Sequence, residues 1–392
     1  MFPLISDLEK IRSLFPHIDK GIVYLNHAAT APLSTPVLSE INRHLSNRAG
    51  ETMDSFELDE EVIRSAKERT ATLIHAESRD RIALTMNTSD ALNIVASGFP
   101  WQKDDEIIIS SAEFPANYYP WRNTVTKGGK IIHHNSSDGR VPVTEIEPLI
   151  TGKTRMIALS AVQFLSGYRA DLHGFGELCR KRSIFLVVDG IQAVGAIDID
   201  VRSMGIHALA CGFQKWMFAP MGTAFLYIGG ELQEIIRQSS LGWLGVQTPW
   251  NFKDLQQSPH QSARRYEGGT LNYSGFYGVN EALSMLLQVG IDNIERSIQE
   301  LSDQLIDGLQ RIEQVNIISA VERQQRAGIV TISLDEIIDS TDIFNKLKRH
   351  NIIVSLREGM IRISPHFYNT YDEIQTFLIV LANLLKERKS SV

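Results

Sequence analysis

The sequence predicts an α/β protein with a mostly parallel central sheet flanked by helices, followed by a smaller C-terminal α+β domain. Between residues 81 and 228, short apolar runs rich in β-branched residues alternate with helical stretches. Strands that are buried on both faces and joined by crossover helices have this pattern. After residue 328 the order becomes strand, helix, strand, helix. At 392 residues, the chain is long enough for two domains.

The expected elements follow in chain order. Ser6 and Glu9 have capping-box spacing and precede a short amphipathic helix, which with its neighbours forms an N-terminal segment, residues 1–20. A large domain, 21–270, then begins with a strand at 21–26 and two helices within 38–75. Its sheet strands are expected at 82–86, 106–110, 130–133, 156–160, 184–189, 207–211 and 222–228, followed by a surface excursion, 243–269. The small domain, 271–392, is expected to be helical over 275–315, with strands at 328–334 and 351–364 and a last helix at 374–385.

Composition excludes several classes of protein. The chain is 43% hydrophobic and 22% charged, with a formal net charge of −7, so it is neither disordered nor attractive to nucleic acid. No apolar run is long enough to cross a bilayer, and we expect a cytoplasmic protein. The two cysteines, Cys179 and Cys211, cannot form a disulfide framework, and no metal site is expected.

The strand at 82–86 runs directly into Thr88 and Ser89 at the start of a helix. Free N–H groups at a helix N-terminus, together with the two hydroxyls, would form a cup for an anion such as phosphate. Ordinary N-capping is the alternative, since Thr and Ser do this in many helices.

Two further strand ends carry groups that chemistry could use. Asp189 ends an apolar strand, and a buried carboxylate needs a partner such as a ligand cation, although a satisfied loop aspartate is equally compatible. Lys215 follows the strand at 207–211 among aromatic, apolar and glycine neighbours. A desolvated lysine is a nucleophilic amine suited to Schiff-base chemistry, although a lysine lying across an apolar surface is the alternative.

Together the three strand ends offer partners for the phosphate, the ring nitrogen and the aldehyde of a phosphorylated pyridine aldehyde. Nucleotide binding is less well supported, because neither G-x-x-x-x-G-K-[ST] nor G-x-G-x-x-G follows a strand. His27, in the loop after the first strand, is a candidate substrate contact or a simple turn histidine.

Over nearly its whole length the chain resembles the class V aminotransferases of pyridoxal-phosphate (PLP) fold type I. This family includes cysteine desulfurases, cystine lyases and isopenicillin-N epimerase-like proteins. The resemblance runs through Tyr24-Leu-Asn-His-Ala-Ala-Thr-Ala-Pro-Leu, Asn87-Thr-Ser-Asp-Ala-Leu-Asn, Glu113-Phe-Pro-Ala-Asn, Val188-Asp-Gly-Ile-Gln-Ala-Val-Gly-Ala, Gly212-Phe-Gln-Lys-Trp, Tyr266-Glu-Gly-Gly-Thr and Ile361-Arg-Ile-Ser-Pro-His-Phe-Tyr-Asn-Thr.

The resemblance implies a role for each matching residue. Lys215 would form the Schiff base with PLP and move protons, and Asp189 would pair with the pyridine nitrogen. The other implied contacts are Gln192 to the ring hydroxyl, Phe114 on the ring, Arg362 to the substrate carboxylate, and Thr88, Ser89 and Gln214 to the phosphate. The family usually forms a homodimer with the site at the interface, where Thr270 would reach the partner subunit's phosphate.

Two departures from the desulfurase pattern narrow the expected function. Phe114 stands where desulfurases stack a histidine, and the segment before Arg362 carries no cysteine. We therefore expect a PLP enzyme that transaminates or epimerises an amino acid. A cysteine or cystine C-S lyase without an active-site cysteine is the alternative, and a PLP-binding protein without catalytic activity is an alternative of another class.

Overall fold

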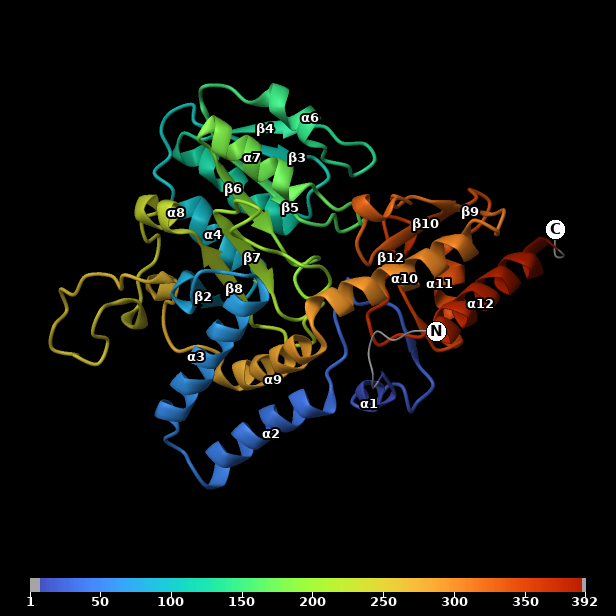
Figure 1. Ribbon diagram of the computed structural model, residues 1–392, viewed down its shortest axis with the longest axis horizontal. Helices are drawn as coiled ribbons and strands as arrows, with labels where there is room; N and C mark the ends of the chain where they lie inside the picture. Colours follow the sequence, from blue (N-terminus) through green and yellow to red (C-terminus); the bar gives the residue numbers. More distant parts are fainter. Residues whose placement is uncertain (1–7, 390–392) are drawn as a thin grey trace.

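A seven-stranded sheet lies at the centre of the large domain, with strand order β2-β8-β7-β6-β5-β3-β4. The computed structural model describes residues 8–389 (Figure 1). Strand β8 is antiparallel to its neighbours β2 and β7, and the other strand pairs are parallel. The mostly parallel sheet predicted from the sequence is confirmed.

The elements have the following bounds. The strands are β1 Val23–Tyr24, β2 Ile82–Thr85, β3 Glu106–Ser110, β4 Lys130–His134, β5 Thr154–Ser160, β6 Phe185–Asp189, β7 Ala208–Gly212, β8 Ala224–Ile228, β9 Val315–Ile317, β10 Val330–Leu334, β11 Ile352–Ile353, β12 Ser355–Arg357 and β13 Met360–Ile363. The helices are α1 Leu8–Arg12, α2 Thr35–Gly50, α3 Phe56–Leu73, α4 Thr88–Gly98, α5 Tyr119–Arg122, α6 Val143–Ile146, α7 Leu172–Arg182, α8 Gly230–Ile235, α9 Tyr273–Val289, α10 Ile291–Leu309, α11 Ser340–Arg349 and α12 Tyr371–Lys389. Ser6 of the expected capping box lies outside the described residues.

Alternating side chains of the strands enter two apolar cores, one on each face of the central sheet. On β6, Leu186 and Val188 enter one core, and Val187 enters the other. Helices α3, α7 and α9 contribute to the first core, and α4 contributes to the second. Burial on both faces explains why these strands are continuous apolar runs in the sequence.

The small domain contains a second sheet of order β12-β13-β10-β9, which is antiparallel throughout. One face of this sheet, including Ile332 and Ile361, packs on a third core shared with α10, α11 and α12. Figure 1 shows these helices on one side of β10 and β12. None of the helices within residues 8–389 has the length and apolar character needed to cross a membrane.

Several boundaries differ from the sequence-based expectation. The strand expected at 21–26 is reduced to β1, which pairs in parallel with β11 of the C-terminal region. Helix α9 buries Phe276 and Leu283 in the core of the large domain, so that core extends beyond residue 270. The strand expected at 351–364 is divided into β11, β12 and β13. Glu358 and Gly359 adopt positive φ and form the tight turn that separates β12 from β13.

Candidate active site

The functional residues predicted on separate strands lie at one edge of the central sheet. Gly212 at the end of β7 and Thr85 at the end of β2 both pair with Ala224, so these two strand ends are level. Asp189 at the end of β6 pairs with Ala210 on β7. Ligands of open α/β sheets bind at the carboxyl ends of the strands, and this edge carries the candidate site.

Lys215 lies in the turn that follows β7 and is partly exposed. Burial lowers the pKa of its amine, and the Arg362 guanidinium acts in the same direction, although the Asp189 carboxylate opposes both. A lowered pKa increases the fraction of free amine at neutral pH, which nucleophilic attack on an aldehyde requires.

Asp189 is a buried carboxyl group, with 2% of its surface exposed. One oxygen accepts a hydrogen bond from the Ile191 N–H at 2.9 Å. Within residues 8–389 no cationic side chain forms an ion pair with it. Burial raises its pKa, and the charge of Glu113 adds to this effect, while the Ile191 N–H and Lys215 oppose it. The site therefore holds a carboxyl group that a ligand cation would stabilise in its ionised form.

Helix α4 begins at this edge with Thr88 and Ser89. The Asn87 side chain caps the helix by accepting a hydrogen bond from the Asp90 N–H. The N–H groups of Thr88 and Ser89 have no acceptor inside the helix, as in every first turn. The Thr88 hydroxyl accepts a hydrogen bond from the Gly212 N–H at 3.1 Å, which connects the α4 N-terminus to the end of β7.

Gln214 and Gln192 hold the turn that carries Lys215. The main-chain oxygen of Gln214 accepts hydrogen bonds from the Ala31 N–H at 2.9 Å and the Thr30 hydroxyl at 3.2 Å. The buried Gln192 amide donates to the Ala28 carbonyl, and its oxygen accepts from the Trp216 indole N–H at 2.9 Å. One N–H of the Gln192 amide remains for a further acceptor.

Phe114 follows β3 and lies near the lysine. The Lys215 Nζ atom is 5.9 Å from the centre of the Phe114 ring, which is itself 45% exposed. A second ring, Phe164, packs edge-on against it at 5.2 Å. An exposed aromatic face next to the lysine is suited to cover a planar ligand.

Arg362 on β13 brings a cation from the small domain to the same site. It is 2% exposed, and it donates to the Ser355 hydroxyl at 3.3 Å and the Phe164 carbonyl at 2.5 Å. Burial lowers its pKa to about 10. No carboxylate pairs with it in the described part of the chain. An interdomain salt bridge, the other role open to a guanidinium at this position, has no acid partner within residues 8–389. A buried guanidinium without an acid partner is a ready site for a carboxylate ligand.

His27 and Thr270 differ from the other predicted site residues. His27 is fully buried; its Nδ1 lies 2.9 Å from the Ser364 carbonyl and its Nε2 2.9 Å from the Tyr368 hydroxyl. Both ring nitrogens are therefore used inside the protein, which favours a structural role for His27 over a contact to the substrate. Thr270 is exposed and lines a cavity of about 640 Å³ with Met86 and Asp90.

Two residues near the site were not assigned a role from the sequence. Glu113 is buried and accepts hydrogen bonds from the Ser160 N–H and hydroxyl and from the amides of Gln163 and Asn117. Arg357 on β12 is close enough that its charge contributes to the lowered pKa of both Lys215 and Arg362. Glu113 stands in the motif Glu113-Phe-Pro-Ala-Asn, which the sequence analysis included, whereas no sequence pattern distinguished Arg357 from a surface arginine.

Within residues 8–389, no group of three or more His, Cys, Asp or Glu residues is placed to hold a metal ion.

Comparison with known proteins identifies the class of enzyme. The family model described as "Aminotransferase class-V" matches residues 23–377, so the chain belongs to this family. A probable cysteine desulfurase of Borreliella burgdorferi is 28% identical over 97% of this chain and 98% of its own length. An uncharacterized aminotransferase of Bacillus subtilis is 27% identical, over 94% and 95%.

Solved structures share the fold. A cysteine desulfurase from Thermococcus onnurineus superposes with a TM-score of 0.86 at 24% identity, covering 97% of this chain and 98% of that one. The cystine C-S lyase C-DES, in complex with its product cysteine persulfide, has a TM-score of 0.85 at 22% identity, with coverage of 94% and 99%. Another structure of C-DES contains glycine covalently linked to PLP.

As a member of the class V family, the chain is a PLP-dependent enzyme. The residues at the edge of the sheet fit this cofactor on their own chemistry. They include a buried carboxyl that forms no ion pair within residues 8–389, a lysine with a lowered pKa and a helix N-terminus with free N–H groups. When bound, PLP supplies an electron-withdrawing ring that weakens the bonds to the Cα atom of an attached amine.

Proposed function

We propose that this enzyme transfers the amino group of an amino acid and that Lys215 both carries PLP and moves the Cα proton. One observation carries the proposal. The groups whose charges act on Lys215 are Asp189, Cys211, Arg362 and Arg357. Of these, Asp189 is assigned to the pyridine ring, the Cys211 pKa is raised by burial, and the arginines are not bases. We therefore assign Lys215, an amine with a lowered pKa at the carboxyl edge of the sheet, as the general base, and a proton shift by one base suffices for transamination.

The other residues are assigned to positioning. Asp189 would face the ring nitrogen, and Gln192 would offer its remaining N–H to the ring hydroxyl. Phe114 would cover the ring without exchanging protons. The phosphate would be bound by Thr88, Ser89 and Gln214 and by the free N–H groups at the start of α4. Arg362 would hold the substrate α-carboxylate.

Epimerisation is the second branch, and it needs a proton delivered to the face of Cα opposite to the one that Lys215 deprotonates. Transamination is favoured because Phe114, the aromatic ring near Lys215, has no acidic hydrogen that could supply such a proton. Epimerisation predicts the opposite enantiomer and no keto acid. This difference in products separates the two branches.

C-S bond cleavage is the second candidate, favoured by the likeness to the fold of a cystine C-S lyase. The chain offers no accessible thiol to receive sulfur as a persulfide, since Cys179 and Cys211 are both buried and burial raises the pKa of both thiols. The β12–β13 turn also contains no cysteine. C-S cleavage by this chain would therefore be an elimination that releases its sulfur product directly, with Lys215 as base.

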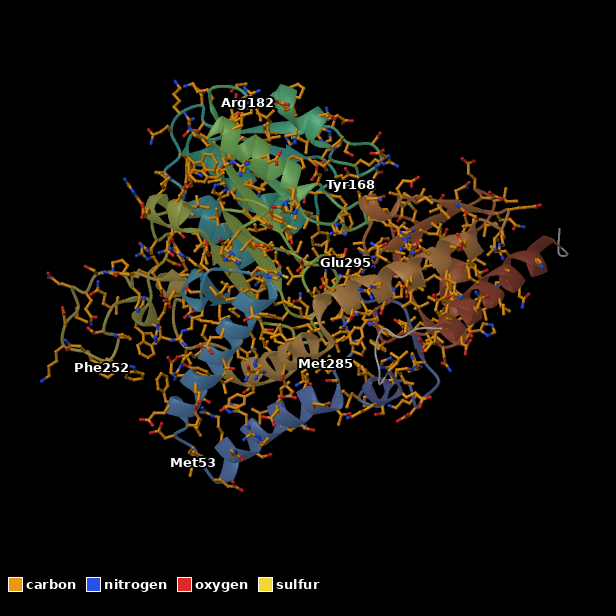
Figure 2. All side chains as sticks on the ribbon, viewed as in Figure 1. Met53, Tyr168, Arg182, Phe252, Met285 and Glu295 are labelled. Carbon is orange, nitrogen blue, oxygen red and sulfur yellow. The ribbon has the colours of Figure 1, made fainter. Side chains whose placement is uncertain are left out.

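A homodimer is part of the proposal, with a second copy of this chain covering an exposed apolar surface. Trp250 of the excursion packs on Phe56 of α3 and on Phe252, with ring centres 4.5 and 5.8 Å apart. Phe252 is 68% exposed, and Met53 in the loop between α2 and α3 is 69% exposed. Figure 2 shows both at the outer edge of the molecule. Exposed apolar patches of this kind favour association. The exposed Thr270 would be available to the second copy.

The test begins with the visible absorption of the protein after incubation with PLP. We expect a visible band that is lost in Lys215→Ala and kept in Lys181→Ala, an exposed lysine on α7. Amino acids are then supplied together with a keto acid, and the products are identified. A new amino acid with a new keto acid supports transamination, and pyruvate with released sulfur supports C-S cleavage. A band without turnover on any amino acid would favour a non-catalytic PLP-binding protein. Absence of a band would overturn the proposal.

A further inference from the structure

The hairpin formed by β12 and β13 has two chemically distinct faces. Ser355 pairs with Arg362, Leu356 with Ile361, and Arg357 with Met360. Because side chains alternate along a strand, Ser355, Arg357 and Arg362 lie on one face and Leu356 and Ile361 on the other. The apolar face packs on the core of the small domain.

The face of the hairpin that carries Ser355, Arg357 and Arg362 is directed toward the candidate active site. Arg362 donates to the carbonyl of Phe164 in the loop after β5, and the neighbouring Thr331 of β10 donates to the carbonyl of Leu165 at 2.5 Å. Figure 1 shows β10 and β12 beside this part of the large domain. Arg357 is therefore on the face of the hairpin that meets the large domain, and it is diagonal to Arg362 across the strand pair, about 7–8 Å away.

Arg357 forms no ion pair within residues 8–389. Its guanidinium donates only to the carbonyl of its own neighbour, Leu356, at 2.8 Å, and the side chain is exposed. Its positive charge contributes to lowering the pKa of both Lys215 and Arg362, which agrees with its position on the face of the hairpin toward the site. Arg357 and Arg362, neither of which has an acid partner within residues 8–389, are thus diagonal to each other on one face of the hairpin.

We propose that Arg357 binds a second carboxylate of the substrate, so that the preferred substrate is an amino acid with an acidic side chain. Arg362 takes the α-carboxylate, and Arg357, on its flexible stem, takes the carboxylate of the side chain. This inference rests on the proposed function, because it specifies the substrate of the same site. Two cations suit a substrate with two carboxylates, whereas a neutral amino acid would leave Arg357 without a partner.

The first experiment compares each acidic amino acid with its neutral amide. Dissociation constants for glutamate, glutamine, aspartate and asparagine are measured from the change in visible absorption of the PLP-loaded protein. A hydrogen-bonded charge pair implies roughly ten- to a hundred-fold tighter binding of the acid. In Arg357→Gln we expect this preference to disappear while affinity for the amide is kept, and Arg357→Lys should restore part of it. Equal affinity for acid and amide in the wild type would overturn the inference.

The matched control is Arg349→Gln, which removes an exposed arginine at the end of α11, on the side of the small sheet away from the site. It should keep the full preference for the acid. If Arg357→Gln keeps the preference as well, Arg357 is a solvated surface residue and the inference is wrong.

A second measurement does not depend on catalysis. Calorimetric titration of the PLP-free protein with glutarate, a dicarboxylate without an amine, should give tighter binding than with butyrate, and Arg357→Gln should remove the difference. Equal binding of the two ligands by the wild type would contradict the paired carboxylate site. If the protein takes up no PLP but binds glutarate more tightly than butyrate, the proposed function is wrong, whereas the inference that two arginines bind a dicarboxylate is kept. If PLP binds and amides are preferred to acids, only the substrate inference fails.

Discussion

Glu113 and Asp189 are two buried carboxyl groups on either side of Ser160 at the end of β5: Glu113 follows β3 and Asp189 ends β6, the two strands that flank β5. Glu113 accepts hydrogen bonds from both the N–H and the hydroxyl of Ser160, the residue that pairs with Asp189 between β5 and β6. Burial raises the pKa of both carboxyls, and the charge of Glu113 raises that of Asp189 further. The protein thus keeps Asp189 in an environment where ionisation is unfavourable without a cation.

This arrangement predicts that Asp189→Asn stabilises the PLP-free protein at neutral pH and weakens PLP binding. A carboxyl whose pKa is higher in the folded protein than in the unfolded chain adds to the free energy of unfolding at pH values below its ordinary pKa, about 4. That contribution is lost as the pH rises toward neutrality. The variant cannot ionise, so its melting temperature without PLP should decrease less than that of the wild type between pH 4 and 7. PLP affinity should fall at least tenfold because the ring nitrogen loses its anionic partner.

Thermal unfolding across this pH range, with and without PLP, measures both effects. The control is Asp138→Asn, which alters an exposed carboxyl and should leave both properties nearly unchanged. A variant that melts earlier than the wild type at pH 7 without PLP would contradict the destabilising role of Asp189.

Much of the site could be predicted because its residues stand at the ends of apolar runs. Asp189 and Lys215 follow strands that are recognisable from their own composition, and parallel strands necessarily bring their carboxyl ends to one edge. The fold class was predictable for the same reason. These features depend on local sequence and on a topological rule, not on the details of packing.

The contacts that could not be predicted join residues far apart in the chain. Arg362 reaches a carbonyl 198 residues away, and the burial of His27 depends on Tyr368, 341 residues away. The strand at 351–364 was expected to be continuous, since nothing in its apolar pattern reveals that Glu358 adopts positive φ. Tertiary packing and turn geometry decided these points.

Trp216→Phe tests whether the residue after Lys215 holds Gln192 in place. The substitution keeps an aromatic ring but removes the N–H that donates to the buried Gln192 oxygen at 2.9 Å. An unsatisfied buried acceptor costs about 1–3 kcal/mol, so the free energy of unfolding should fall by this amount. PLP affinity should fall as well, because the Gln192 amide would no longer be fixed. Urea denaturation and PLP titration measure the two effects.

The matched control is Trp250→Phe, because Trp250 is 53% exposed and its indole N–H forms no hydrogen bond in the described part of the chain. It should change stability by less than about 0.5 kcal/mol. Equal losses in the two variants would mean that the Gln192 contact contributes nothing.

His27→Phe should remove part of the acid sensitivity of the fold. Burial lowers the pKa of His27 to about 3. A histidine with a lowered folded pKa contributes stability above its ordinary pKa, about 6.5, and this stability is lost as the pH falls from there toward 3. At pH 7 the variant should be less stable by about 1–3 kcal/mol, since it loses two buried hydrogen bonds. The deficit should shrink at pH 5. His173→Phe, on an exposed histidine of α7, should show neither effect, and a deficit independent of pH would exclude protonation of His27 as its cause.

Gly359→Ala tests whether the tight turn between β12 and β13 sets the position of both arginines. Gly359 has a φ of 74°, and an added Cβ would meet no atom within 4 Å, so the backbone conformation is the main source of any cost. An L-residue in the left-handed region costs about 1–2 kcal/mol.

Gly152→Ala is the matched control, because Gly152 is also exposed and an added Cβ there would also meet no atom within 4 Å, but its φ is not positive. We expect Gly359→Ala to lower the free energy of unfolding by about 1 kcal/mol and to raise KM more than it lowers kcat, because the turn fixes where Arg357 and Arg362 lie for binding. If both alanine variants behave alike in urea denaturation and in kinetics, the turn does not position the substrate-binding face.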